Sequence, residues 1–121
     1  MPNNAKLLIV EDDKTLAQVT QELIHSLGYQ TLVAHNGQDA MRILTEHKDE
    51  INLVLLDINL PDMNGGEVAL KFKQKQPELK IILTTGSTNL NVNDFQGIAD
   101  ALLFKPYTLS ELSQALSRTL N

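Results

Sequence analysis

The stretch LVLLDINLPDMNGGE, from Leu53 to Glu67, sets a run of apolar residues directly against an acid. Ile51 and the four apolar residues 53–56 lead to Asp57, after which Asn, Pro, Asp and Gly predominate. A short continuous apolar run bounded by turn-forming residues is typical of a buried strand. We therefore expect a rigid central strand that holds one carboxylate at its carboxyl end.

Outward from this stretch, short apolar runs alternate with helical patterns along the whole chain. The apolar runs cover residues 7–10, 31–34, 51–56, 81–83 and 101–104. Apolar residues at helical spacing follow each run: Leu16, Val19, Leu23 and Leu27; Ala40, Ile43 and Leu44; Val68, Ala69 and Phe72; Val92, Phe95 and Ile98 or Ala99; Leu109, Leu112, Leu116 and Leu120. Gly28 and Pro77 stand where helices are expected to stop. The alternation predicts five strand–helix units.

The predicted strands are continuously apolar, which indicates that both faces of the sheet are covered. This pattern is typical of a parallel sheet with helices on either side, so we predict a doubly wound α/β fold. The 121 residues contain no low-complexity tract, no further internal repeat and no linker-like segment. A chain of this size is long enough for one core. We expect residues 1–121 to form a single domain.

Composition excludes several classes of function. With no cysteine, the chain has neither disulfides nor thiolate metal ligands, which suits a reducing compartment. No apolar segment approaches the roughly 20 residues of a membrane span, and the start resembles no signal peptide, so we expect a cytoplasmic protein without membrane contact. The net charge of −5 and the lack of a basic cluster argue against direct nucleic-acid binding.

Polar residues gather where the predicted strands end, and this is where doubly wound sheets hold their ligands. Taken singly, each has an ordinary explanation, such as a helix N-cap for Asp13, an Asx-turn for Asp57 or a solvated cation for Lys105. The strand-end residues are Glu11, Asp12 and Asp13 after the first run, Asp57 after the third, Thr84, Thr85 and Gly86 after the fourth, and Lys105 and Pro106 after the fifth.

Together these residues predict a site for a cation and a phosphoryl group. Carboxylates collected at one sheet edge repel one another, so they are expected to take up protons or to bind a hard cation. Oxygen-only ligands favour Mg²⁺, or Mn²⁺, over zinc. A carboxylate beside such a cation, an ammonium and a hydroxyl is suited to phosphoryl transfer, with Asp57 as the nucleophile that forms an acyl phosphate.

Four motifs, LLIVEDD, LVLLDINLPDMNG, IILTTG and ALLFKPY, occur in an order and separation that resemble the receiver domain of two-component response regulators. The resemblance covers essentially the whole chain. It implies a flavodoxin-like sheet with strand order 2-1-3-4-5 and helices on both faces. It also implies a signalling domain that at most catalyses its own phosphorylation and dephosphorylation.

The resemblance assigns roles to residues around the acid cluster. Asp57 is similar to the phosphoacceptor, which receives its phosphoryl group from a phosphohistidine on a sensor histidine kinase or a phosphotransfer protein. Glu11 and Asp12 match the acidic pair, with Asp12 contacting Mg²⁺ directly and Glu11 through water. The backbone carbonyl of Asn59 is implied as a further metal ligand. Asp13 is left as a helix cap.

Three further positions match the switch of the family. Thr85 is similar to the hydroxyl that moves onto the phosphoryl group, and Lys105 is similar to the conserved-looking cation. Pro106 resembles the proline that follows a cis peptide bond. Phosphorylation is expected to draw Thr85 and Lys105 inward and to change the surface of the fourth helix, of strand 101–104 and of the last helix.

The sequence also departs from the family pattern. Leu102 occupies the position, three residues before Lys105, that usually carries Tyr or Phe. The segment 86–100 is rich in Asn, at positions 89, 91 and 93, so a brief, displaced or mobile fourth helix is expected there. Ser87, two residues after Thr85, stands where the family often carries larger polar side chains, and the resemblance implies that this position and Asn59 tune the lifetime of the phosphoryl group.

These departures keep one alternative function open. A protein interaction module could keep the fold and bind Mg²⁺ without responding to phosphorylation. The downstream protein or output domain and the choice between a monomer and a phosphorylation-promoted dimer stay open.

Other kinds of site fit the sequence poorly. TTGSTN, residues 84–89, is similar to the phosphate loop of flavodoxins, but that loop follows the first strand and aromatic residues make only 4% of this chain. Asp57-Ile58-Asn59 lacks the second acid of haloacid-dehalogenase-like phosphatases. The three histidines, at positions 25, 35 and 47, are scattered and are expected to have structural or surface roles.

Overall fold

The computed structural model describes residues 5–86, 95 and 97–120, and its centre is a five-stranded sheet. All neighbouring strands run parallel, in the order β2-β1-β3-β4-β5. The strands are β1 (Lys6–Val10), β2 (Gln30–Ala34), β3 (Ile51–Asp57), β4 (Lys80–Thr85) and β5 (Ala101–Phe104). The predicted doubly wound fold and its strand order are confirmed.

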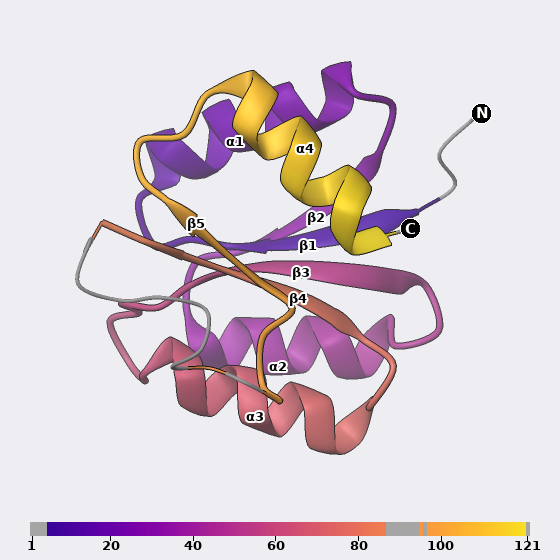
Figure 1. Ribbon diagram of the computed structural model, residues 1–121. Helices are drawn as coiled ribbons and strands as arrows, with labels where there is room; N and C mark the ends of the chain where they lie inside the picture. Colours follow the sequence, from indigo (N-terminus) through magenta and orange to yellow (C-terminus); the bar gives the residue numbers. More distant parts are fainter. Residues whose placement is uncertain (1–4, 87–94, 96, 121) are drawn as a thin grey trace.

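Helices cover both faces of this sheet (Figure 1). In the described ranges these are α1 (Lys14–Ser26), α2 (Gly37–Glu46), α3 (Gly65–Lys75) and α4 (Leu109–Leu120). α1 and α4 lie on one face, and α2 and α3 lie on the other (Figure 1). Over these same ranges, none of the helices has the length and apolarity needed to traverse a bilayer.

The helix expected between the fourth and fifth strands falls mostly on residues 87–94 and 96. Ser87 and the asparagines at positions 89, 91 and 93 therefore lie outside the described residues. The described neighbours Gly97 to Asp100 lead directly into β5, where the N–H of Asp100 donates to the carbonyl of Ile81 at 2.8 Å.

The two faces of β1 show why its apolar run is continuous. Leu7 and Ile9 pack into a core cluster with residues of α1 and α4, including Ile24 and Leu112. Leu8 and Val10 face the opposite core cluster, where the helical residues are Ala40, Leu44, Val68, Ala69 and Phe72. Because each buried aliphatic side chain contributes about 1.5–3 kcal/mol, both layers hold the central strands in place.

Polar caps begin the helices at the carboxyl edge of the sheet. The Asp13 carboxylate accepts from the N–H of Leu16 at 3.0 Å and caps α1, as predicted. Asn36 and Asn64 cap α2 and α3 in the same way, by accepting from the N–H groups of Asp39 and Gly66 at 2.7 Å each. A capping side chain satisfies an N–H that the helix itself leaves free, so these turns are locally determined.

Candidate functional site

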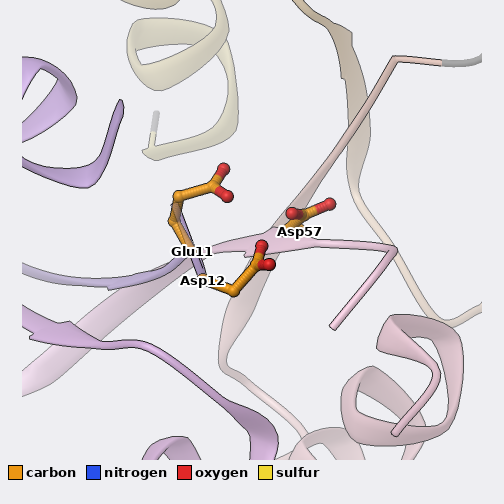
Figure 2. Close-up of side chains that lie close together, drawn as sticks. All are labelled: Glu11, Asp12 and Asp57. Atoms are coloured by element: carbon orange, nitrogen blue, oxygen red, sulfur yellow. The ribbon is translucent and has the colours of Figure 1, made fainter. Parts of the chain in front are cut away.

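The ends of β1 and β3 bring three carboxylates together. Val10 is paired with Leu56, so the residues that follow each strand emerge side by side. Glu11, Asp12 and Asp57 each offer a carboxylate oxygen, and these atoms all lie within 4.8 Å of one another. Figure 2 shows the three side chains projecting from the two strand ends into one region. Glu11 and Asp57 are only 5% and 4% exposed, whereas Asp12 faces solvent.

Lys105 supplies the positive charge of this site. Its Nζ lies 2.7 Å from Oε1 of Glu11 and 3.0 Å from Oδ2 of Asp57. Since β4 separates β5 from β3, the side chain reaches across the end of β4. The ammonium therefore joins two carboxylates from different strands, as an ion pair that is largely removed from water.

The backbone around Lys105 is held from both sides. Its N–H donates to the carbonyl of Thr85 at 2.8 Å, and its peptide bond to Pro106 is cis, as the family resemblance implied. The hydroxyls of Tyr107 and Thr20 are hydrogen-bonded at 2.8 Å, which ties the segment to α1. No motif pointed to this contact, because it joins residues 87 positions apart.

Burial and charge set the protonation of the site. Burial raises the pKa of the Glu11 carboxyl to about 7, although hydrogen bonds from Lys105 and from the N–H of Asp13 act in the opposite direction. Burial alone would lower the pKa of Lys105, but its hydrogen bonds to Glu11 and Asp57 outweigh this effect and raise it. Without a cation, Glu11 thus takes up a proton near neutral pH while Lys105 stays charged.

Thr85 and Leu102 lie on the strands next to the acids. Thr85 ends β4 and is completely buried, and its neighbour Thr84 is paired with Asp57 in the ladder. Leu102 pairs with Leu83 inside β5 and packs against the core cluster on the side of α2 and α3. The hydroxyl-bearing residue and the acids therefore share one sheet edge, whereas Leu102 lies in the body of the sheet.

A tight loop, residues 58–64, follows Asp57. The N–H of Asn59 donates to Oδ1 of Asp57 at 3.0 Å, and Asn59 forms an isolated antiparallel bridge with Asn64. The N–H of Gly65 then donates to the carbonyl of Ile58 at 2.8 Å, which closes the loop. The predicted ligand Asn59 thus lies in a segment whose two ends are both fixed close to Asp57.

The donor set fits a hard divalent cation. All three candidate side chains offer carboxylate oxygens, the ligand type that Mg²⁺ prefers. Carboxylate oxygens that lie within 4.8 Å of one another are close enough to face a single cation. The acid cluster is thus compatible with divalent metal binding.

The histidines make ordinary contacts, in agreement with their predicted structural roles. His25 is hydrogen-bonded to the Thr31 hydroxyl at 2.8 Å, and His47 pairs with Glu50 at 3.1 Å. Nδ1 of His35, by contrast, lies 3.0 Å from the backbone carbonyl of Glu11 and supports the end of β1 from β2. No sequence signal distinguished His35 from the other two.

Comparison with known proteins identifies the family. A family model described as the response regulator receiver domain matches residues 7–117. The chain belongs to the response regulator receiver family. It is therefore a receiver domain of the two-component type, and its acid cluster stands at the place where the strand-end motifs predicted it.

Receiver proteins of known role are similar over most of this chain. Sporulation initiation phosphotransferase F of Bacillus subtilis is 32% identical over 119 residues, which cover 97% of this chain and 94% of that protein. The transcriptional regulatory protein CpxR of Escherichia coli is 34% identical over 108 residues, or 88% of this chain. The chain spans only 45% of the length of CpxR and 13% of the sensor kinase/phosphatase LuxN of Vibrio harveyi.

Solved receiver structures superimpose closely on this one. The receiver domain protein from Clostridium thermocellum has a TM-score of 0.90 at 28% identity, over 97% of this chain and 94% of that chain. Response regulator TrrA from Thermotoga maritima, solved in complex with Mg²⁺-BeF, has a TM-score of 0.87 at 28% identity, over 96% and 99% of the two chains.

Proposed function

We propose that this receiver accepts a phosphoryl group on Asp57 from a phosphohistidine of a sensor histidine kinase or phosphotransfer protein. The observation that carries the proposal is the position of Lys105, whose Nζ lies 3.0 Å from Asp57 and 2.7 Å from Glu11. A fixed ammonium beside a nearly buried carboxylate can neutralise the charge on an incoming phosphoryl group.

In the proposed reaction, a carboxylate oxygen of Asp57 attacks phosphorus. A P–O bond forms while the P–N bond to the donor imidazole breaks, and the imidazole leaves with the bonding electron pair and is protonated. Asp57 becomes an acyl phosphate, and the donor histidine returns to its free form. The hydrogen bond from the N–H of Asn59 orients the Asp57 carboxylate before the attack.

The proposed metal site consists of Asp12, Asp57 and the carbonyl of Asn59, with Glu11 acting through water. Mg²⁺, or Mn²⁺ in its place, would supply Lewis-acid neutralisation of the phosphoryl oxygens. Asp12 is the exposed member of the cluster, so it is the carboxylate most accessible to an ion arriving from solvent. TrrA, a structural relative with Mg²⁺-BeF, supports this assignment.

The proposed switch runs from the phosphoryl group through Thr85 and Lys105 to β5 and α4. Phosphorylation adds negative charge that attracts the Thr85 hydroxyl and the Lys105 ammonium. Lys105 directly follows β5, and Thr85 at the end of β4 is paired with Phe104 of β5 and accepts a hydrogen bond from the N–H of Lys105. Movement at either residue is thereby transmitted to Leu102, to Pro106 and to the outer surface of β5 and α4.

An adduct experiment tests this function. Beryllofluoride with Mg²⁺ should form a stoichiometric adduct with the wild-type chain and none with Asp57→Asn, as measured by fluorine NMR. Amide chemical-shift changes that spread from the site into residues 97–107 support the switch. An adduct whose shifts stop at the site would favour the interaction module, and a wild-type chain without any adduct would contradict phosphoacceptance.

A further inference from the structure

Asp62 lies at the tip of the loop that follows Asp57 and binds the start of a different element. Its Oδ1 accepts from the N–H of Gly37 at 2.8 Å, and its Oδ2 accepts from the N–H of Gln38 at 3.0 Å. Both carboxylate oxygens are therefore used on the first turn of α2, 24 and 25 residues away along the chain. These hydrogen bonds, that from Gly37 foremost, lower the pKa of Asp62 below its ordinary value.

The helix does not depend on Asp62 for its local cap. Asn36 already accepts from the N–H of Asp39 at 2.7 Å and has the extended backbone of an N-cap residue. The first-turn N–H groups of α2 thus have two acceptors. The N–H groups of its first two residues donate to Asp62 in the loop, and the N–H of its third residue donates to the local cap Asn36. A helix N-terminus stabilises a nearby carboxylate, so the contact holds the loop as much as it caps the helix.

Close packing at Gly37 shows that the loop tip is seated on α2. A Cβ placed on Gly37 would lie 2.3 Å from Cγ and 2.4 Å from Sδ of Met63, and 3.3 Å from Oδ1 of Asp62. A methyl group on residue 37 would require the Met63 side chain to move from this position. Asp62, through hydrogen bonds, and Met63, through packing, therefore both hold the loop against the start of α2.

We propose that Asp62 is a positioning residue for phosphoryl transfer, which fixes the acceptor loop against α2 and thereby holds Asn59 beside Asp57. This inference rests on the proposed function of Asp57. The loop has only six residues between Asp57 and Asn64, so releasing its tip removes one of the contacts that hold Asn59 in place, alongside the bridge to Asn64 and the closing hydrogen bond of Gly65. Asp62 is not a member of the acid cluster of Glu11, Asp12 and Asp57, so its proposed effect acts through the loop.

The experiment compares Asp62→Ala with Asn36→Ala, which removes a cap from the same helix turn without touching the loop. Loss of a group that is hydrogen-bonded to a metal ligand typically costs 10–100-fold in metal affinity or activity, and Asp62 acts less directly, through the loop, so the low end of this range applies. We expect the Mg²⁺ dissociation constant to rise about tenfold in Asp62→Ala and to stay unchanged in Asn36→Ala, with Asp62→Asn in between because it keeps one acceptor. Both Ala variants should lose a similar amount of thermal stability.

Amide hydrogen exchange of Asn59 in the metal-free protein gives a second measurement that needs no phosphorylation. Asp62→Ala should accelerate it several-fold relative to Asn36→Ala. Equal exchange and equal Mg²⁺ affinity in the two variants would overturn the positioning role and leave Asp62 as a simple cap. A wild-type chain that forms no beryllofluoride adduct would instead overturn the proposed function. In that case the exchange rates of the Asn59 amide in Asp62→Ala and Asn36→Ala would still show whether Asp62 holds the loop.

Discussion

Glu11 and Asp57 are nearly buried carboxylates that share one ammonium, that of Lys105, at 2.7 Å and 3.0 Å. One positive charge cannot fully compensate two negative charges in a partly dehydrated place. Glu11 is the residue most affected, because burial raises the pKa of its carboxyl to about 7. In the metal-free protein, a proton on Glu11 therefore neutralises the charge that the proposed divalent cation would otherwise neutralise.

This protonation predicts a pH-dependent stability in the metal-free protein. The folded pKa of Glu11, about 7, lies above its ordinary value of 4.5, so the folded state binds more protons between these limits. The contribution of the Glu11 carboxyl to the free energy of unfolding is then fully present below pH 4.5 and is lost as the pH rises through 7. Between pH 4.5 and about 7, the free energy of unfolding of the wild type should fall by up to about 3 kcal/mol relative to that of Glu11→Gln. Urea unfolding without Mg²⁺ measures this difference.

Glu11→Gln is the matched control because its amide remains neutral throughout. The other carboxylates titrate in both proteins, so only the difference between the two curves reports on Glu11. Parallel stability curves from pH 4.5 to 8 would show that the folded pKa of Glu11 is not raised.

At the scale of elements, the start of α3 lies directly against the backbone of the acceptor strand. A Cβ on Gly65 would lie 2.5 Å from the carbonyl oxygen of Asp57 and 2.6 Å from Cα of Ile58. Backbone atoms of a central strand cannot move aside as a flexible side chain can. Gly65 is therefore required for the close approach of α3 to the end of β3.

Gly65→Ala should destabilise the fold by about 2–3 kcal/mol, because the added methyl overpacks a contact with backbone atoms. Gly86→Ala is the control, since a Cβ there meets no atom of the described part of the chain within 4 Å, and it should change stability by less than about 0.5 kcal/mol. Urea unfolding of the two variants gives the comparison. Equal midpoints would mean that α3 can shift away from Asp57 at little cost.

At the scale of the whole molecule, the strand order assembles the site. β1 and β3 are neighbours and contribute the three acids, whereas Lys105 follows β5, two strands away from β3. In the unfolded chain Asp57 is separated by tens of positions from the adjacent pair Glu11 and Asp12, so the three acids do not bind one ion together there. A cation that binds here therefore stabilises the folded state by mass action.

Mg²⁺ should accordingly raise the melting temperature, and Asp12→Ala should abolish this increase. At 100 times the dissociation constant, the stabilisation is about 2.7 kcal/mol. Asp13→Ala is the matched control: it removes the cap of α1, costing about 0.5–2 kcal/mol, but leaves the acid cluster intact. A Mg²⁺ increment that survives in Asp12→Ala, or is absent in the wild type, would refute the proposed metal ligands.

Local patterns in the sequence determined the elements of this protein and the kind of chemistry at their ends. The apolar runs predicted all five strands because both sheet faces exclude water, and Asp13 predicted its own role because a cap acts within three residues. Acids and a lysine after these runs predicted a phosphoryl site, since the carboxyl ends of parallel strands share one edge.

Only the tertiary structure decided which of these residues meet and how they are held. The apolar runs resemble one another, so hydrophobicity alone does not encode the order in which strands pair; that order decides that Lys105 reaches Glu11 and Asp57 over the end of β4. No local sequence pattern predicted the hydrogen bond between His35 and Glu11 or the contact of Asp62 with α2. Each is a hydrogen bond across 24 or 25 residues, and its energy depends on where two elements pack rather than on the residues beside it.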